Sequence, residues 1–250
     1  MKLFILIRSV VISFVFLFWT LLMSALGLVC NILFNNKKID DGIIGSWARG
    51  TCLLFNVKVV VKNPEKIPTE GCLLLFNHSS FFDIFSLAGQ FSEIRFGAKL
   101  ELFSIPVFGP AMRRTGTLPI TRNNREETLR VYSQAQSRFA AGEKFALSPE
   151  GGRFHGENLF PFKAGPFLFA MSSEVPICPV VIHGAYETLP KGALFANSDR
   201  WSRMIVLEIL DPVSTKGYTV EDRGTLQSIV YEKMNAAWKN PDDQALKLKV

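Results

Sequence analysis

The sequence predicts an α/β domain with a mixed, largely parallel central sheet that is flanked by helices and preceded by an N-terminal membrane-anchoring helix pair. Short apolar or β-branched runs alternate with helical segments over residues 57–240, a pattern typical of a sheet covered by helices. From Val10 to Cys30 there is no charged residue. We therefore expect a membrane anchor over residues 1–55 and an α/β domain over residues 56–250.

Composition narrows the partners that this chain can have. The 250 residues carry a net charge of +6 and are 48% hydrophobic. A basic protein with an apolar N-terminus suits an anionic membrane surface or anionic substrates. No basic run with interleaved aromatic residues is present, so we expect no nucleic acid partner. The four cysteines lack metal-ligand spacing and lie in apolar segments, which favours buried or lipid-facing thiols in a reducing compartment over a disulfide or a metal site.

The N-terminal element is predicted to be a retained membrane helix over residues 1–35. Its uncharged stretch is long enough to cross a hydrocarbon core of about 30 Å. A cleaved signal peptide is the alternative, because Lys2 and Arg8 form a basic start, but the apolar stretch is long and no small-x-small cleavage site follows. Basic residues flank both sides, Lys2 and Arg8 before the stretch and Lys37 and Lys38 after it, so charge bias does not set an orientation. Spanning the bilayer and lying in one leaflet both stay open. A second helix, capped by Asp40 or Asp41, should reach about Phe55.

The remaining chain is expected to alternate between strands and helices. The strands are predicted at residues 57–62, 71–76, 94–99, 116–122, 144–147, 175–182 and 204–210. The helices are predicted at residues 80–89, 124–141, 161–173 and 221–239, with Gly89 and Gly142 as stops. The run that ends at Phe76 is continuously apolar, which indicates a strand buried on both faces.

Polar side chains follow four of these strands: Asn77-His78, Lys99, Arg122, and the segment from Glu150 to Arg153. If the strands are parallel, these groups gather at one edge of the sheet, outside the carboxyl ends. One strand-end cation is most often a solvated surface residue. Three cations that can converge, Lys99, Arg122 and Arg153, suggest a pocket for an anion such as phosphate.

His78 and Asp83 are the candidate acid–base pair. His78 precedes a predicted helix with Ser80 as its N-cap, and Asp83 lies in the first turn, from where its carboxylate can reach back to one ring nitrogen. That contact would fix the tautomer and leave the other nitrogen to take a proton. The alternative is that Asp83 belongs to an ordinary capping box and His78 is a satisfied residue at a strand end.

No protein nucleophile is evident in the sequence. It contains no G-x-S-x-G motif, no H-E-x-x-H motif, no P-loop and no dinucleotide-binding fingerprint. The nucleophile is therefore expected to be a hydroxyl of the substrate. Gly151-Gly152 is either a plain turn or backbone that a substrate must approach closely.

The segment from Asn77 to Asp83 resembles the N-H-x4-D block of glycerolipid acyltransferases. The chain is similar to the 1-acyl-sn-glycerol-3-phosphate acyltransferase family from residue 57 to about residue 220. The later blocks follow in order: Gly97 to Lys99 with Pro106 to Gly109, Gly116 to Arg122, Pro149 to Arg153, Phe162 to Gly165, and Val175 to Val180. Gly152 departs from the family pattern, which has Thr there, and this puts the identity of the acceptor in question.

The resemblance implies an acyltransferase in phospholipid biosynthesis. His78, oriented by Asp83, would deprotonate the sn-2 hydroxyl of lysophosphatidic acid, which attacks the thioester of acyl-CoA or acyl carrier protein. Lys99 and Arg153, with Arg122, would hold the phosphate, while Glu150 and Gly151 shape the loop. No metal or cofactor is implied. The expected location is the lipid bilayer, at the cytoplasmic face of a bacterial inner membrane. Another lysolipid acceptor and a non-catalytic lipid-binding protein are the alternatives.

Overall fold

A seven-stranded sheet with the order β1-β7-β6-β2-β5-β3-β4 forms the centre of the computed structural model, which describes residues 2–121 and 124–241. Strands β6, β2, β5, β3 and β4 are parallel, whereas β7 is antiparallel to β6 and parallel to β1. This confirms the predicted mixed, largely parallel sheet. The strands are β1 (Val57–Lys62), β2 (Leu73–Phe76), β3 (Ile94–Lys99), β4 (Leu118–Ile120), β5 (Lys144–Leu147), β6 (Ile177–His183) and β7 (Arg203–Ile209).

The helices are α1 (Lys2–Phe34), α2 (Lys37–Leu54), α3 (Phe82–Gln90), α4 (Phe108–Arg114), α5 (Arg125–Ala140), α6 (Ala164–Ser172), α7 (Ala185–Thr188) and α8 (Arg223–Lys239), with 3-10 turns at Pro64–Lys66 and Leu100–Ser104. The predicted caps of α2 are wrong, because Asn36 accepts the hydrogen bond from the Lys38 N–H. The N-cap of α3 is Phe81, one residue after the predicted Ser80, and the helix continues past the predicted stop Gly89 to Gln90. Helix α4 was not predicted, although Pro110 lies in its first turn, where proline is tolerated.

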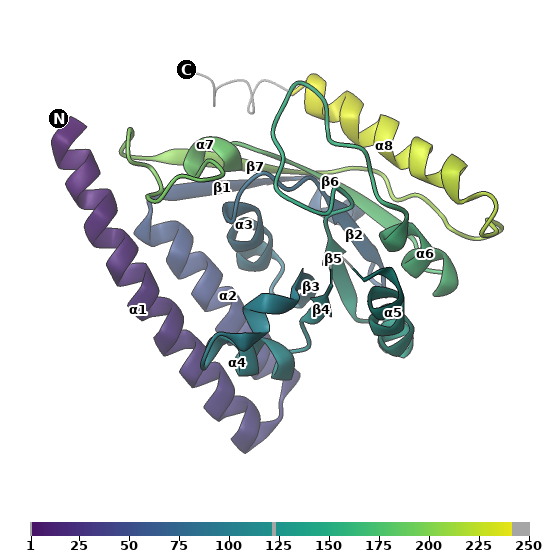
Figure 1. The fold of residues 1–250 in the computed structure, drawn as a ribbon, viewed down its shortest axis with the longest axis horizontal. Helices are drawn as coiled ribbons and strands as arrows, with labels where there is room; N and C mark the ends of the chain where they lie inside the picture. The colour runs from purple at the N-terminus through teal and green to yellow at the C-terminus, as the bar shows by residue number, and fades with distance from the viewer. Residues whose placement is uncertain (1, 122–123, 242–250) are drawn as a thin grey trace.

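Helices cover both faces of the sheet (Figure 1). A hydrophobic layer packs between the sheet and the helices on each face. Leu74 and Phe76 of β2 point into the layer formed by α2 and α3, against which α1 also packs. Leu73 and Leu75 point into the layer formed by α5, α6 and α8. Strand β2 is therefore buried on both faces, as its continuous apolar run predicts, and its polar continuation comes out at the edge of the sheet.

Helix α1 lies along the domain, against α2 and α4 (Figure 1). The Trp19 indole N–H donates to the Trp47 carbonyl at 3.1 Å, and the Trp47 indole N–H donates to Thr20 Oγ1 at 3.1 Å. Within the described residues, α1 is the one helix long and apolar enough to cross a membrane, over Leu3–Phe34, and 11% of its most apolar window is buried. A membrane-anchoring role for α2 stays a prediction.

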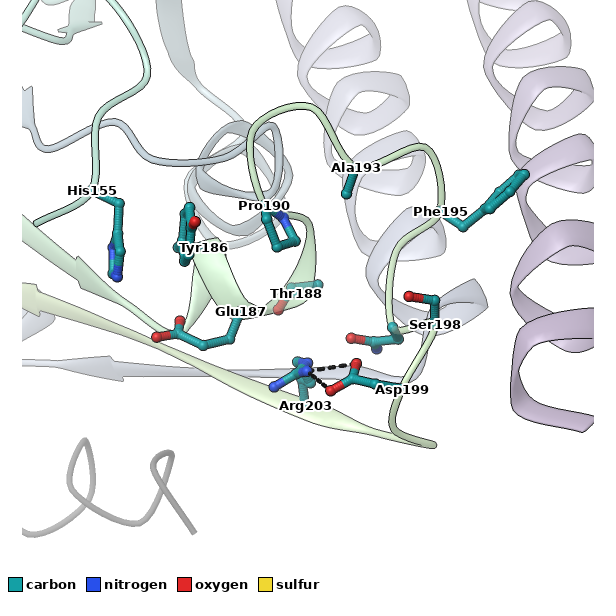
Figure 2. Close-up of a pocket in the computed structure, with 11 residues that line it drawn as sticks. His155, Tyr186, Glu187, Thr188, Pro190, Ala193, Phe195, Ser198, Asp199 and Arg203 are labelled. Atoms are coloured by element: carbon teal, nitrogen blue, oxygen red, sulfur yellow. Dashed lines mark hydrogen bonds and ion pairs between the residues drawn. The ribbon is translucent and has the colours of Figure 1, made fainter. Parts of the chain in front are cut away.

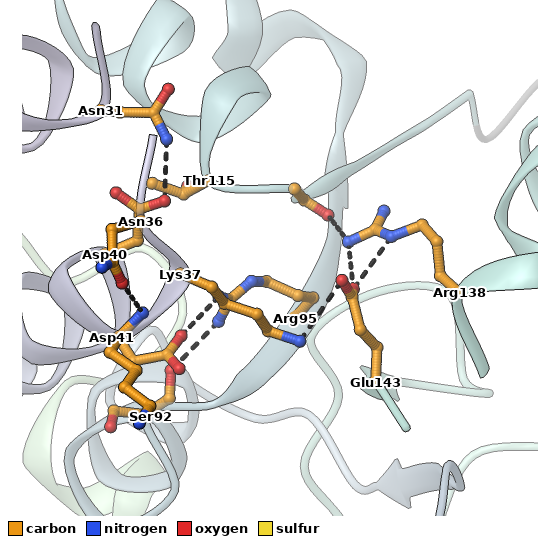
Figure 3. A network of polar contacts seen from close by, with 12 residues as sticks. Asn31, Asn36, Lys37, Asp40, Asp41, Ser92, Arg95, Thr115, Arg138 and Glu143 are labelled. Atoms are coloured by element: carbon orange, nitrogen blue, oxygen red, sulfur yellow. Dashed lines mark hydrogen bonds and ion pairs between the residues drawn. The ribbon is translucent and has the colours of Figure 1, made fainter. Parts of the chain in front are cut away.

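A chain of polar contacts joins the first two helices to the sheet (Figure 3). Asn31 Nδ2 of α1 donates to Asp40 Oδ2 of α2 at 2.7 Å. Asp41, next in α2, forms an ion pair with Arg95 of β3, and the Arg95 side chain is buried. A further ion pair, Lys37–Glu143 at 3.3 Å, links the start of α2 to the residue before β5. These contacts fix α1 and α2 relative to the strands that carry the site.

Replacing Asp41 with alanine is expected to lower the free energy of unfolding by about 3 kcal/mol. The change leaves the buried Arg95 guanidinium without its carboxylate partner, and an unpaired buried charge is costly. Thermal unfolding in detergent measures the loss. Glu127→Ala is the control, because it removes an exposed ion pair with Arg130 and should cost less than about 1 kcal/mol. Equal losses in the two variants would contradict a structural role for the Asp41–Arg95 pair.

Candidate active site

The end of β2 is fixed by the side chain of Asn77. Its amide Nδ2 donates to the Ile182 carbonyl at 3.0 Å, and its Oδ1 accepts from the Ile182 N–H at 2.7 Å. The buried amide thus continues the pairing of β2 with β6 by one residue, in place of backbone bonds. This bond pair sets where the chain leaves the sheet and therefore where His78 lies.

His78 and Asp83 are in direct contact. His78 Nδ1 lies 2.8 Å from Asp83 Oδ2, and the same oxygen accepts the backbone N–H groups of Ser79 and Ser80 at 2.8 Å each. Asp83 is fully buried, whereas the His78 side chain is 13% exposed. A carboxylate that already accepts two N–H bonds can only accept a third, so Nδ1 carries the ring proton and Nε2 is left as the basic nitrogen.

The capping interpretation of Asp83 and its pairing with His78 are both present in the structure. The bond from the Ser80 N–H to Asp83 is the backward bond of a capping box. The forward half differs from the prediction, because Ser80 Oγ accepts from the Phe82 N–H at 3.3 Å. One carboxylate therefore organises the turn before α3 and orients the imidazole at the same time.

The loop after β5 brackets the backbone of His78, because β5 is the neighbour of β2. Glu150 Oε1 accepts from the His78 N–H at 2.8 Å and Oε2 accepts from the Phe160 N–H at 3.0 Å. On the other side of His78, the Phe154 N–H donates to the His78 carbonyl at 2.8 Å. Glu150 is 2% exposed with both oxygens occupied, so it shapes the site by holding its backbone.

The pKa of Glu150 is raised to about 7, chiefly by burial and in small part by the charge of Asp83, while the backbone N–H donors of His78 and Phe160 oppose the shift. A raised carboxyl pKa stabilises the fold below the unfolded value of 4.5, and that stability is lost as pH rises to about 7. We expect the wild-type protein to lose up to about 3 kcal/mol across this window, because one pKa unit corresponds to about 1.4 kcal/mol. Glu150→Gln should flatten this slope in thermal unfolding between pH 5 and 8. Parallel slopes in the two proteins would contradict the assignment.

Different obstacles oppose a side chain at each of the two glycines of this loop, Gly151 and Gly152. Gly151 has φ +71°, and a Cβ there would lie 2.6 Å from Lys163 Cε. Gly152 has ordinary φ, but a Cβ there would lie 3.0 Å from the ring of Phe154. That ring stacks on Phe160 with centroids 3.9 Å apart. A threonine at position 152 would therefore press on the stacked pair, which gives the departure from the family pattern a physical cause.

The predicted phosphate-binding cations differ in their distance from His78. The Arg153 guanidinium carbon lies 4.2 Å from the ring centre of Phe81, in the turn between His78 and α3. Lys99 of β3 is level with Asn77 in the register of the strands. Strand β5 lies between β3 and β2, so the two residues are about 10 Å apart along the edge of the sheet. Lys99 forms an exposed ion pair with Glu101 at 3.0 Å. Arg122 lies outside the described residues.

Two further cations near this loop were missed as site candidates. Lys163 packs over Gly151, with Nζ 2.8 Å from the position of a Cβ. Lys191 Nζ lies 5.4 Å from the ring centre of Phe154. The family-like segment from Phe162 to Gly165 was a signal for Lys163. Nothing in the sequence indicated Lys191, because its place depends on the turn at α7, which was not predicted.

A hollow of about 320 Å³ lies farther along the same edge, between α7 and the following loop (Figure 2). One wall is His155 stacked on Tyr186, with centroids 3.8 Å apart. On another side, Arg203 is neutralised by both oxygens of Asp199 at 2.7 and 2.6 Å, and Glu187 adds negative charge. The hollow thus offers no net positive charge for a phosphate, and none of the predicted site residues lines it.

Other chemistries have little support among the described residues. No group of three or more His, Cys, Asp or Glu side chains converges there in an arrangement that could hold a metal. The four cysteines are free, and burial raises the pKa of Cys52, Cys72 and Cys178 to about 12. These thiols are therefore protonated and unreactive at neutral pH.

Comparison with known proteins places this geometry in a family. A family model described as Acyltransferase matches residues 58–183. The chain is 27% identical over 239 residues to the 1-acyl-sn-glycerol-3-phosphate acyltransferase of Haemophilus influenzae, covering 94% of this chain and 96% of the relative. It is 30% identical over 196 residues to the enzyme of that name from Helicobacter pylori, covering 76% and 81%.

The fold has a solved counterpart in the crystal structure of the 1-acyl-sn-glycerophosphate (LPA) acyltransferase PlsC from Thermotoga maritima. The TM-score is 0.79 at 24% sequence identity, and the likeness covers 96% of this chain and 97% of that chain. The family match spans about half of this chain, including the segments that carry His78, Asp83 and Arg153. The chain therefore belongs to the acyltransferase family and is an acyltransferase.

Proposed function

We propose that this enzyme transfers a fatty acyl group from a thioester to the sn-2 hydroxyl of 1-acyl-sn-glycerol 3-phosphate, giving phosphatidic acid. The observation that carries the proposal is the contact of His78 Nδ1 with the buried Asp83, which leaves Nε2 as a base at the end of a buried strand. Relatives from two bacteria, each covered over more than three quarters of its length, are named for this reaction.

The proposed reaction begins with proton transfer from the acceptor hydroxyl to His78 Nε2. The oxygen attacks the thioester carbonyl, and the tetrahedral intermediate collapses to the ester as the thiolate leaves. The imidazolium, stabilised by Asp83, returns the proton to the departing thiolate. This scheme uses no protein nucleophile, which agrees with the protonated state of the buried thiols, and it needs no resident metal or cofactor.

Arg153 is proposed to bind the phosphate of the acceptor, with further contributions from Lys99 and Arg122. Its guanidinium already lies over Phe81, beside the His78 turn, and a planar guanidinium suits phosphate oxygens. Glu150 and Gly151 keep their proposed part in shaping the loop that presents Arg153.

Arg153→Met is expected to raise the apparent KM for lysophosphatidic acid about 10- to 100-fold, because a charge-assisted contact is lost. Activity on an acceptor without phosphate, such as a monoacylglycerol, should change little. Arg153→Lys should recover part of the loss, and Arg130→Met, at an exposed cation of α5, is the matched control. An unchanged KM for lysophosphatidic acid would show that the phosphate binds elsewhere.

An assay of purified protein against a panel of lysolipids, with acyl-CoA and with acyl carrier protein as donors, tests the proposed substrate. We expect turnover of lysophosphatidic acid to exceed that of the other acceptors. Position 152 lacks the threonine hydroxyl expected in this loop and lies beside the Phe154–Phe160 stack. This difference favours a second candidate acceptor, a lysolipid with a different headgroup. Robust turnover of such an acceptor without turnover of lysophosphatidic acid would select that candidate.

We further propose that α1 lies within one leaflet at the cytoplasmic face of a bacterial inner membrane. A helix of 33 residues is about 50 Å long, and this one is bonded to the domain near both ends, through Ser9 and Asn31. An upright α1 would carry α2 and α4 into the hydrocarbon core, where their polar groups are costly. The free cysteines agree with a reducing compartment.

A further inference from the structure

Four large apolar side chains with most of their surface in solvent belong to three segments that are bonded to one another near the N-terminal end of α1. Phe4 of α1 is 64% exposed and Leu53, near the end of α2, is 78% exposed. Leu194 and Trp201, in the connection between α7 and β7, are 84% and 53% exposed. Clustered exposed apolar residues mark a surface that binds something. These four residues are called the end patch below.

The end patch is held by specific bonds. Phe4 stacks on Trp201 at an interplanar angle of 3°, with centroids 6.1 Å apart. Asn56 Nδ2, just past α2, donates to the Trp201 carbonyl at 3.2 Å. In the same connection, Ser9 Oγ donates to the Asn197 carbonyl at 2.9 Å, and Asn197 Nδ2 donates to the Phe55 carbonyl at 2.7 Å. The connection is therefore fastened to α1 and to the end of α2, and its apolar side chains are presented on a fixed frame.

The chemistry of the end patch matches a lipid surface. Its Phe4 belongs to α1, which exposes large apolar side chains from Leu3 to Phe34. The Arg8 guanidinium lies 4.3 Å from the ring centre of Trp201 and donates to its carbonyl at 3.0 Å. An indole beside a guanidinium is suited to the boundary between acyl chains and headgroups, because both side chains have an apolar body and a polar end. The positive charge of Arg8 favours anionic headgroups.

We infer that the end patch is a second membrane contact, inserted into the headgroup region of a bilayer containing anionic lipid. The inference rests on the proposed attachment of α1 to the membrane. Contact along one helix leaves the domain free to rotate about the helix axis. Leu53 and Leu194 belong to other segments, so their insertion removes that freedom and sets the angle at which the sheet edge with His78 meets the lipid surface.

Spin labels placed on the end patch test this inference on vesicles of phosphatidylethanolamine and phosphatidylglycerol. In a Cys30→Ser background, where the other cysteines are buried, a nitroxide is attached at Leu194→Cys or at Glu232→Cys on the exposed face of α8. We expect the label at position 194 to collide with oxygen in the lipid phase and to be shielded from a water-soluble nickel complex. The label at position 232 should show the reverse.

Vesicle binding of serine variants gives a second readout. Leu194→Ser combined with Trp201→Ser should weaken partitioning at least about tenfold, since two large side chains lose their apolar burial. Val220→Ser, at an exposed apolar site before α8, should leave partitioning unchanged. If the wild-type chain binds but the label at position 194 stays in water, this inference is overturned and the α1 attachment stands. If the wild-type chain does not bind, both are overturned.

Discussion

Replacing His78 with alanine is expected to abolish acyl transfer, with a fall in kcat of at least about a thousandfold while the protein stays folded and membrane-bound. General base catalysis by a positioned side chain contributes about 10²- to 10⁴-fold, and His78 is the base that Asp83 orients in this scheme. Folding should survive, because Asp83 keeps the backbone N–H bonds of Ser79 and Ser80. Acyl release from a radiolabelled thioester to lysophosphatidic acid measures the loss.

A His78→Asn variant separates the base from the bond to Asp83. The asparagine amide can place an N–H near the position of Nδ1, so it keeps the contact with Asp83 but offers no basic nitrogen. It should be as inactive as His78→Ala and more stable to heat. Substantial activity in either variant would assign the proton transfer to another group.

The features that the sequence predicts well are those set by local pattern. The continuous apolar run before His78 requires a strand buried on both faces, and a parallel sheet then brings the ends of β2 and β5 together. The reach of Asp83 to His78 follows from a five-residue separation across a helix start. Most predicted strands accordingly match the observed ones within about two residues, which is the usual uncertainty of an element boundary.

The features that the sequence does not predict depend on contacts between distant residues. Arg95 and Asp41 are 54 positions apart, and neither has a local signal that names its partner. Asn36, and not the predicted Asp40 or Asp41, caps α2, because its side chain accepts from the Lys38 N–H and the helix begins before the two aspartates. Those aspartates instead bind Asn31 and Arg95, which the folded arrangement alone brings near.

Asp83→Asn is expected to reduce kcat about 10²- to 10⁴-fold, because the imidazolium formed on His78 loses its ionised partner. One oxygen of Asp83 accepts from the Ser79 and Ser80 N–H groups and contacts His78 Nδ1, so an asparagine oxygen in that place can keep all three contacts, but as a neutral acceptor. A neutral acceptor stabilises the imidazolium less than a carboxylate does, which makes Nε2 a weaker base for the acceptor hydroxyl. Initial rates at saturating thioester measure the effect.

Asp83→Ala tells this effect apart from a loss of folding. Alanine removes every acceptor at this position and leaves two backbone N–H groups unpaired in a buried turn, so it should be inactive and also less stable by about 2 to 5 kcal/mol. Asparagine should lose activity with nearly the wild-type unfolding temperature, since it keeps the acceptor for the turn. If Asp83→Asn instead keeps nearly full activity, then the carboxylate serves the turn before α3 alone. His78 would in that case act as a base whose tautomer is set by another group, and the pairing of His78 with Asp83 would lose its catalytic meaning.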